Sequence, residues 1–224
     1  MSITDNVKYV IFDVDGTIVD SMEAWDGCYG KYMKIRGLTP DPSHIAVMKT
    51  MSVDDSGKYL KKEFDLPDDA KDITAGFNNI ILQFYTTEAE IKPHMLDMMN
   101  ALSEKGIKLA VATASSEDII IPLLTKLGIV DRFDKILTVR GIGIPKSNPE
   151  FFTRCASLLN IKPENAVMIE DMPHASLSAK KAGLYTIGVR DRQSEKDEAE
   201  LKSIVDVYLS SDEDYDKFIN EIRG

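Results

Sequence analysis

Cysteine is scarce in this chain of 224 residues, which has only Cys28 and Cys155 and no CxxC pair. Two cysteines without a histidine cluster beside them do not supply the ligands of a structural zinc site. Two buried thiols are also more typical of a reducing compartment than a disulfide bond is. The sequence therefore predicts a protein without structural zinc or disulfides, and a cytoplasmic location.

Long apolar runs and an excess of basic residues are missing as well. No stretch approaches the roughly 20 apolar residues that a membrane-spanning helix needs, and the first ten residues lack the basic and apolar regions of a signal peptide. The formal net charge is −10 and the sequence pI is near 4.8, which argues against binding to nucleic acid or to an anionic membrane. We therefore expect neither partner, and either a monomer or a weak homodimer.

The most informative stretch is residues 9–21, YVIFDVDGTIVDS. Residues 9–12 are apolar and predict a buried strand, which is followed at once by Asp13 and Asp15. Two carboxylates at the carboxyl end of a buried strand are costly unless they face a cation or serve a reaction. The alternative interpretation is an exposed, aspartate-rich turn. An open α/β sheet places its ligands at this edge.

Helical patterns without strand signals fill residues 20–92. They predict a helix over residues 20–37 and shorter helical segments at residues 45–50, 53–64, 70–77 and 77–86. Further strands are predicted at residues 107–113, 135–139, 166–170, 185–189 and 205–209, with helices before the first of them, between the first four and after the last. This order predicts an α/β fold: a Rossmann-like parallel sheet core formed by residues 1–19 and 93–224, with a small α-helical domain of residues 20–92 inserted into it.

Polar residues follow two further predicted strands. Thr113 ends one strand, and Ala114 and the serines after it lead into a helix, which offers a hydroxyl and free backbone N–H groups to an anion. The same residues could be an ordinary helix cap. Glu170 and Asp171 end another strand, and together with the first two aspartates they form an all-oxygen site that suits Mg²⁺ better than zinc.

Four stretches of the chain resemble the motifs of the haloacid dehalogenase superfamily, most of whose members are Mg²⁺-dependent phosphohydrolases. They are DVDGT at residues 13–17, VATAS at 111–115, GIPKSNPEFF at 143–152 and AVMIEDMPHASLSAKKAGLYTIGV at 166–189. Two departures from the family pattern are plain. Ser147 replaces the first proline of the third motif, and residues 172–175 replace a serine followed by a small residue and glycine in the fourth.

The resemblance implies that Asp13 is the nucleophile, which forms an aspartyl-phosphate, and that Asp15 is the general acid and base. It implies that the phosphoryl group is bound by Thr113, Ala114 and Lys146. It also implies that Mg²⁺ is held by Asp13, the main-chain carbonyl of Asp15, Asp171 and either Glu170 itself or water molecules that Glu170 orients.

The predicted helical insert resembles the cap of the subfamily that includes phosphoglycolate phosphatases and β-phosphoglucomutases. Such a cap closes over the site and reads the leaving group of a small phosphorylated metabolite. Our candidates for reading that group are Trp25, Lys49 and His174. Each also has a structural interpretation, since a tryptophan on an amphipathic helix is more often part of the core and a histidine at a helix start is as often structural.

Two other functions fit parts of the pattern. A β-phosphoglucomutase-like sugar-phosphate mutase would share the motifs, but this chain has Trp25 and Val53 at the places where those mutases have a histidine and an arginine. A receiver-like signalling domain also uses strand-end acids, a hydroxyl residue and a lysine, but it has no place for a large helical insert after the first strand. A dehalogenase is less expected because that branch lacks the second aspartate.

Overall fold

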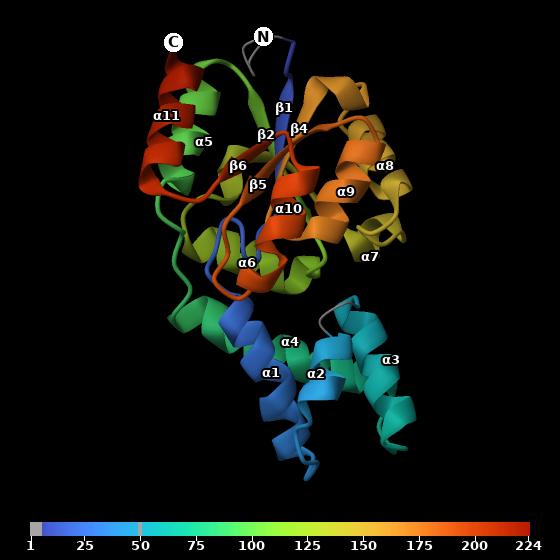
Figure 1. The fold of residues 1–224 in the computed structure, drawn as a ribbon. Helices are drawn as coiled ribbons and strands as arrows, with labels where there is room; N and C mark the ends of the chain where they lie inside the picture. Colours follow the sequence, from blue (N-terminus) through green and yellow to red (C-terminus); the bar gives the residue numbers. More distant parts are fainter. Residues whose placement is uncertain (1–5, 49–50) are drawn as a thin grey trace.

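The computed structural model describes residues 6–48 and 51–224. Six parallel strands form one sheet at the centre of the molecule, in the order β3-β2-β1-β4-β5-β6 (Figure 1). The strands are β1 (Tyr9–Phe12), β2 (Lys108–Thr113), β3 (Phe133–Thr138), β4 (Ala166–Glu170), β5 (Tyr185–Val189) and β6 (Val207–Leu209). The sequence prediction of a Rossmann-like α/β core is confirmed, and the sheet order brings the ends of β1, β2 and β4 together.

Helices cover both faces of the sheet, because β1 is buried on both sides and its side chains alternate between two apolar clusters. Val10 and Phe12 pack with helices α5, α6 and α11, whereas Tyr9 and Ile11 pack with α8 and α9. The helices of the core are α5 (Met95–Glu104), α6 (Glu117–Lys126), α7 (Val139–Ile142), α8 (Pro149–Leu158), α9 (Pro173–Lys181), α10 (Glu198–Ile204) and α11 (Asp212–Arg223). Three short 3-10 turns, η1 (Val130–Arg132), η2 (Pro163–Asn165) and η3 (Glu195–Asp197), complete this part.

Four helices lie together below the sheet in Figure 1, and we call them the helical group. They are α1 (Met22–Ile35), α2 (Pro42–Met48), α3 (Val53–Glu63) and α4 (Ala70–Thr87). Residues 70–77 and 77–86, which we expected to be two segments, form the single helix α4. Phe77 at its middle packs edge-on against Tyr29 and Tyr32 of α1, at ring-centroid distances of 5.1 and 4.7 Å, so the stripe of buried residues continues through the point where a break was expected.

The chain passes between the sheet and the helical group twice, and the two connections are tied to each other. Val19 in the first connection forms an isolated antiparallel bridge with Ile91 in the second. The Lys92 N–H donates to the carbonyl of Ile18 at 2.8 Å, and the Lys92 ammonium donates to the carbonyl of Gly16 at 2.6 Å. The end of the helical group is therefore fixed directly beside the first strand-end motif.

Smaller differences from the predicted elements concern their ends. The strands expected at residues 135–139 and 205–209 are shifted by up to two residues, and α7 and α10 were not predicted. Pro122 left open whether the helix after β2 starts near the proline or earlier, and α6 begins at Glu117 with Pro122 inside it. Within the described parts of the chain, none of the helices combines the length and the apolar character needed to cross a membrane.

Candidate active site

Three acidic side chains meet at the carboxyl ends of β1 and β4. These strands are hydrogen-bonded neighbours in parallel register, with Phe12 opposite Ile169, so the residues that follow them meet at one edge of the sheet. Asp13, Glu170 and Asp171 are all buried, and carboxylate oxygens from the three lie within 4.8 Å of one another. The structure therefore brings together three of the four acids that the sequence singled out as metal ligands.

Lys146 supplies the cation of this cluster. Its buried ammonium group donates to Asp13 Oδ1 at 2.7 Å, to Glu170 Oε2 and to the carbonyl oxygen of Ala112 at 3.1 Å. Its loop leads into α8, where Asn148 is the N-cap and accepts from the Glu150 N–H at 2.9 Å. The proline that the family motif has at Ser147 is therefore not needed to place the lysine.

The charges of the cluster do not balance, since three buried carboxylates share one ammonium group. Burial raises the pKa of Asp13 above its ordinary value, and so does the Glu170 carboxylate, while Lys146 acts against them. Burial and the neighbouring acids likewise hold the pKa of Asp171 well above the usual range. Burial alone would lower the pKa of Lys146, but Asp13 and Glu170 raise it overall. A further cation would relieve this repulsion.

Asp171 has the free oxygen that such a cation needs. Its Oδ1 accepts from the Thr17 hydroxyl at 3.2 Å, whereas its Oδ2 is buried and has no hydrogen-bond partner among the described residues. The space beside it depends on Gly16, where an added Cβ would lie 2.4 Å from Oδ2 and where φ is +84°. Carboxylate oxygens are the donors that hard divalent cations prefer, so Asp13 and Asp171 fit such an ion.

Glu170 is engaged on both oxygens. Its Oε1 accepts from the N–H groups of Asp171 and Met172, each at 3.2 Å, and its Oε2 accepts from Lys146. Glu170 therefore orders the turn after β4 and fixes Lys146. Its oxygens are less available to a cation than those of Asp13 and Asp171.

Asp15 stands apart from the acid cluster, and its carboxylate accepts hydrogen bonds from three hydroxyl groups. Oδ1 accepts from Ser21 at 2.6 Å and from Tyr85, and Oδ2 accepts from Ser115 at 2.8 Å. The Tyr85 hydroxyl in turn accepts from the indole N–H of Trp25 at 3.2 Å. These donors come from the core and from helices α1 and α4, so the position of Asp15 depends on both parts of the molecule.

Ser21, Tyr85 and Ser115 are site residues that reading the sequence missed. Ser115 directly follows Thr113 and Ala114, which were predicted to bind phosphate, so its place in the sequence could have indicated a site residue. Tyr85 continues the i, i+4 series of buried residues on α4 from Ile73 through Ile81, which is the pattern of a core position. Nothing in the spacing of these residues indicates that the Tyr85 hydroxyl group binds Asp15.

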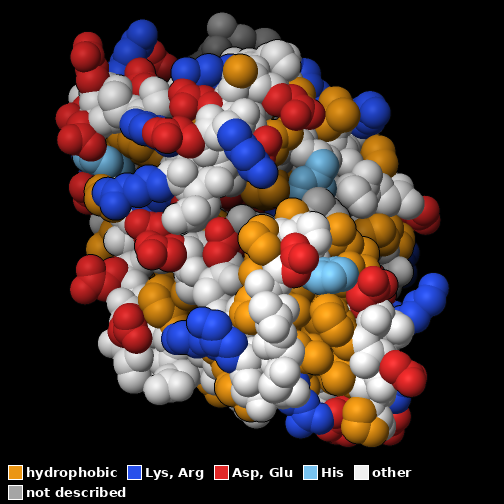
Figure 2. Space-filling model, turned by 60° about the horizontal axis from the view of Figure 1, so that its bottom comes forward, with side chains coloured by type: hydrophobic (Ala, Val, Ile, Leu, Met, Phe, Trp, Pro, Cys, Tyr) orange, Lys and Arg blue, Asp and Glu red, His pale blue; other side chains and the backbone are white. Residues whose placement is uncertain are grey.

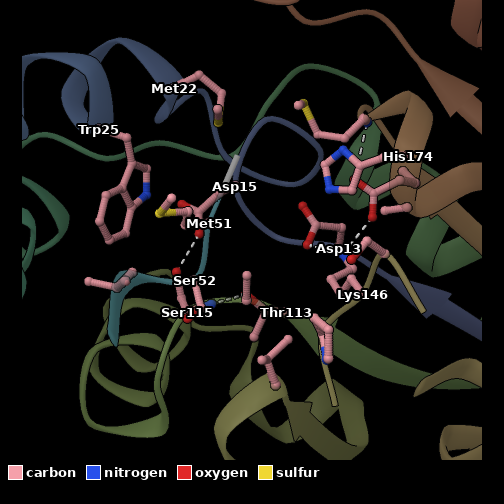
Figure 3. Close-up of a pocket in the computed structure, with 18 of the residues that line it drawn as sticks. Asp13, Asp15, Met22, Trp25, Met51, Ser52, Thr113, Ser115, Lys146 and His174 are labelled. Carbon is pink, nitrogen blue, oxygen red and sulfur yellow. Dashed lines mark hydrogen bonds and ion pairs between the residues drawn. The ribbon is translucent and has the colours of Figure 1, made fainter. Parts of the chain in front are cut away.

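The predicted phosphate-binding residues line a cavity that extends from Asp13 (Figure 3). Thr113 is buried at the end of β2, and its hydroxyl oxygen accepts from the Ser115 N–H at 3.0 Å. Ala114 and Lys146 line the same cavity. The end of β2 thus faces the end of β1 across the space in which a ligand of Asp13 would lie.

Two of the three substrate-reading candidates also line this cavity. Trp25 is buried, and Figure 3 shows it on the opposite side from His174. Partial desolvation lowers the pKa of His174 below its ordinary value, although the residue stays exposed at the pocket wall. Lys49, the third candidate, lies outside the described residues.

This chain belongs to the haloacid dehalogenase-like hydrolase family, whose model matches residues 10–189. The match spans the four motifs and the helical group between the first two of them. The family assignment made from the motifs is confirmed, and with it the interpretation of the chain as a hydrolase.

Relatives with known names are similar over most of their length. The chain is 25% identical to validoxylamine A 7'-phosphate phosphatase from Streptomyces hygroscopicus subsp. limoneus, over 81% of this chain and 85% of the relative. It is 28% identical to phosphoglycolate phosphatase from Neisseria meningitidis, over 83% and 81%. The fold is similar to the crystal structure of β-phosphoglucomutase from Clostridium difficile, with a TM-score of 0.74, 22% identity, and 96% and 99% coverage.

Replacing Lys146 with methionine leaves Asp13 and Glu170 without their partner beside a third buried carboxylate, and we expect a loss of about 3–5 kcal/mol in the free energy of unfolding near pH 8. The loss should be smaller near pH 5, about one pH unit above the ordinary carboxyl pKa, because the unpaired carboxyl groups of the variant bind protons more readily there. Because the folded pKa of Asp13 lies above its unfolded value, the folded state binds more protons, and stability falls as pH rises above 3.8.

Urea denaturation at both pH values in EDTA measures these losses. Lys58→Met is the matched control, since Lys58 is exposed and pairs with Asp55 on the surface, where solvent screens the interaction and a much smaller loss is expected. Equal losses for the two variants, or a larger loss for Lys146→Met at the lower pH, would contradict the charge balance described above.

Proposed function

We propose that the protein is a Mg²⁺-dependent phosphatase that hydrolyses the phosphomonoester of a small metabolite through an aspartyl-phosphate intermediate. The observation that supports this most directly is the position of Asp13. Its carboxylate is paired with Lys146, lies beside the unpartnered oxygen of Asp171 and opens onto a cavity. The phosphatase names of the relatives point to the same class of substrate.

In this proposal Asp13 attacks phosphorus in line, the new bond joins its carboxylate oxygen to phosphorus, and the bond to the leaving oxygen breaks. Lys146 and the backbone at Thr113 and Ala114 stabilise the charge on the equatorial oxygens. Water then attacks phosphorus, phosphate leaves, and the Asp13 carboxylate is restored. Pairing with Lys146 favours the anion of Asp13 and acts against the burial and the Glu170 carboxylate that raise the pKa of Asp13.

Asp15 is the group we propose for proton transfer. It would protonate the leaving oxygen in the first step and accept a proton from water in the second. Its position supports this division of labour, because it lines the same cavity as Asp13 but does not belong to the acid cluster. The hydroxyl groups of Ser21, Tyr85 and Ser115 hold its carboxylate in place, and we propose Tyr85 as a positioning residue.

For the metal, we propose that Mg²⁺ is held by Asp13, Asp171 and the main-chain carbonyl of Asp15. Bound there, the ion would neutralise charge on the phosphate and align it with Asp13. The residues fit this ion: the donors are oxygens, one of them is buried without a partner, and the cluster has an excess of negative charge. Glu170 would act indirectly, by fixing Lys146 and orienting water.

We also propose that residues 20–92 act as a cap over a core of residues 1–19 and 93–224. Support comes from the cavity, whose lining includes Trp25 and Val53 of the helical group as well as Asp13 and Lys146 of the core. The ties at Val19 and Ile91 are where a closing motion would bend the chain. Because both parts of the lining come from one chain, a monomer or weak homodimer is sufficient for activity.

A cytoplasmic location is part of the proposal. Both cysteines are buried and free in the structure, which suits a reducing compartment.

Asp13→Asn should lower the rate of phosphate release from an aryl phosphate in Mg²⁺ by about 10³-fold or more, because the amide cannot attack phosphorus. A phosphate-release assay measures this, with Asp131→Asn as a control at an exposed position on η1. Wild-type turnover in Asp13→Asn would rule out the mechanism.

Mg²⁺ should raise the melting temperature of the wild-type protein. At 100 times Kd, binding adds about 2.7 kcal/mol, which corresponds to about 5–10 °C for a chain of this size. Asp171→Asn should lose most of this shift, whereas Asp131→Asn should keep it. Differential scanning fluorimetry with Mg²⁺ or EDTA measures the shift. A full Mg²⁺ shift in Asp171→Asn would place the ion elsewhere.

Tyr85→Phe removes one hydrogen bond to Asp15 while keeping the ring in the core. We expect kcat to fall by about 10-fold, a part of the roughly 10²–10⁴-fold effect of general acid–base catalysis, and KM to change little. Steady-state kinetics separate the two constants. Tyr32→Phe is the control, since it removes a hydroxyl from another buried tyrosine of the helical group. A change confined to KM would argue against a positioning role.

A further inference from the structure

The cavity beyond Asp13 has walls of a distinct kind. On the side of the helical group its apolar lining is Met22, Trp25, Tyr29, Met51 and Val53, beside the polar Asp26 and Ser52. On the side of the core its apolar lining is Val139, Pro145, Met172 and Ala175, beside the polar Ser147 and His174. Figure 3 shows Met22, Trp25 and Met51 on one side and Asp13 and Lys146 on the other. A ligand whose phosphoryl group lies at Asp13 would therefore place its leaving group against carbon and thioether surfaces.

The Trp25 side chain in the cavity wall is held by neighbouring side chains. Trp25 is 7% exposed, and its indole N–H is used in the hydrogen bond to Tyr85. Its ring also packs against Tyr29, with a centroid distance of 6.3 Å. With its one donor occupied, the indole offers the cavity an apolar surface rather than a polar contact.

The charges of the lining are unfavourable to a second anionic group. Across residues 6–48 and 51–224, the lining includes one Lys or Arg, which is Lys146, and its ammonium group is already bonded to Asp13 and Glu170. Asp26 lines the cavity on the other side and adds negative charge. A carboxylate or second phosphate on the leaving group would meet Ser52, Ser147 and His174, whose pKa is lowered by desolvation, but no free cation among the described residues, so its desolvation would be costly.

The size of the cavity suits a small leaving group as well. Its volume is about 160 Å³, close to the roughly 150 Å³ of an apolar cavity that holds benzene. The phosphoryl group and about one small ring would fill this space, and a larger leaving group would extend through its open side into solvent. Figure 2 shows hydrophobic side chains gathered broadly on the face that includes the helical group.

From the lining, its charges and its volume we infer that the substrate is the monophosphate ester of a small, uncharged alcohol or phenol with an apolar face. This inference rests on the proposed phosphatase function and narrows it. Esters that have a second negative charge, such as a carboxylate or another phosphate, are excluded as preferred substrates. The mutase alternative is disfavoured on the same ground, since its sugar bisphosphate intermediate would need a second cation.

The test compares two esters of the same shape and different charge: the phosphate esters of glycolamide and of glycolate. Phenyl phosphate serves as the uncharged ring-sized probe. We expect kcat/KM in Mg²⁺ to be highest for phenyl phosphate, and about 10-fold or more lower for the glycolate ester than for the glycolamide ester, because the carboxylate lacks a partner.

A pair of variants tests whether charge in the wall decides this preference. Val53→Lys introduces a cation at the cavity and should reduce the difference between the two esters by about 10-fold. Val53→Met has a similar length without the charge and should leave the difference unchanged. If both variants reduced the difference equally, the preference would depend on shape, and the inference would be wrong.

A binding measurement separates the inference from the proposed function. Trp25 is the single tryptophan of the chain, so its fluorescence reports on the cavity directly. In Asp13→Asn, phenyl phosphate and the glycolamide ester should change this fluorescence at concentrations about 10-fold or more below the glycolate ester. This readout does not require turnover.

The possible results distinguish the proposed phosphatase function from the inferred substrate preference. Absence of phosphate release from all three esters by the wild type, with the expected order of binding, would reject the phosphatase and leave the specificity of the cavity supported. Phosphate release with equal or better use of the glycolate ester would overturn the inference and leave the phosphatase. A preference for the glycolate ester that Lys49→Gln abolishes would overturn it too, by assigning the second charge to a residue outside those described.

Discussion

The ion pair between Lys146 and Asp13 is the interaction on which the rest of the site depends. A single buried ammonium group holds Asp13 and Glu170 at the ends of two neighbouring strands. Burying such a pair is costly in itself, so the fold retains it at the expense of stability. One lysine does not neutralise three carboxylates, and the remaining negative charge suits the same place to a divalent cation. The proposed chemistry thus follows from the excess of negative charge at this edge of the sheet.

The helical group extends this arrangement to the leaving group. Helices α1 and α4 contribute Trp25 and Tyr85, and these two side chains connect the apolar wall of the cavity to the carboxylate of Asp15. In the proposed mechanism, leaving-group contact and proton transfer are therefore linked through one hydrogen-bonded chain. A substrate that displaced Trp25 would disturb Asp15, and this would connect the fit of the substrate to the rate.

Local sequence patterns were sufficient for much of the fold. The strand at residues 9–12 could be predicted because four consecutive apolar residues next to two acids have few alternatives, and the glycine and proline signals bounded most core helices. The division of α4 at residue 77 was wrong because the periodicity of a short window does not reveal that Phe77 packs into α1. The α7 and α10 helices were missed since each is too short to show a period.

The sequence by itself determined the acids, because carboxylates at the ends of two buried strands are costly without a cation or a reaction, and it assigned Thr113 and Lys146 through the resemblance of their motifs to the family. Only the tertiary structure decided how they are paired. It separated Asp15 from the acid cluster, assigned both oxygens of Glu170 and left one oxygen of Asp171 without a partner. It also brought Tyr85 across 70 residues to Asp15, which no spacing could show, since a hydrogen bond between distant segments is fixed by packing and not by local order.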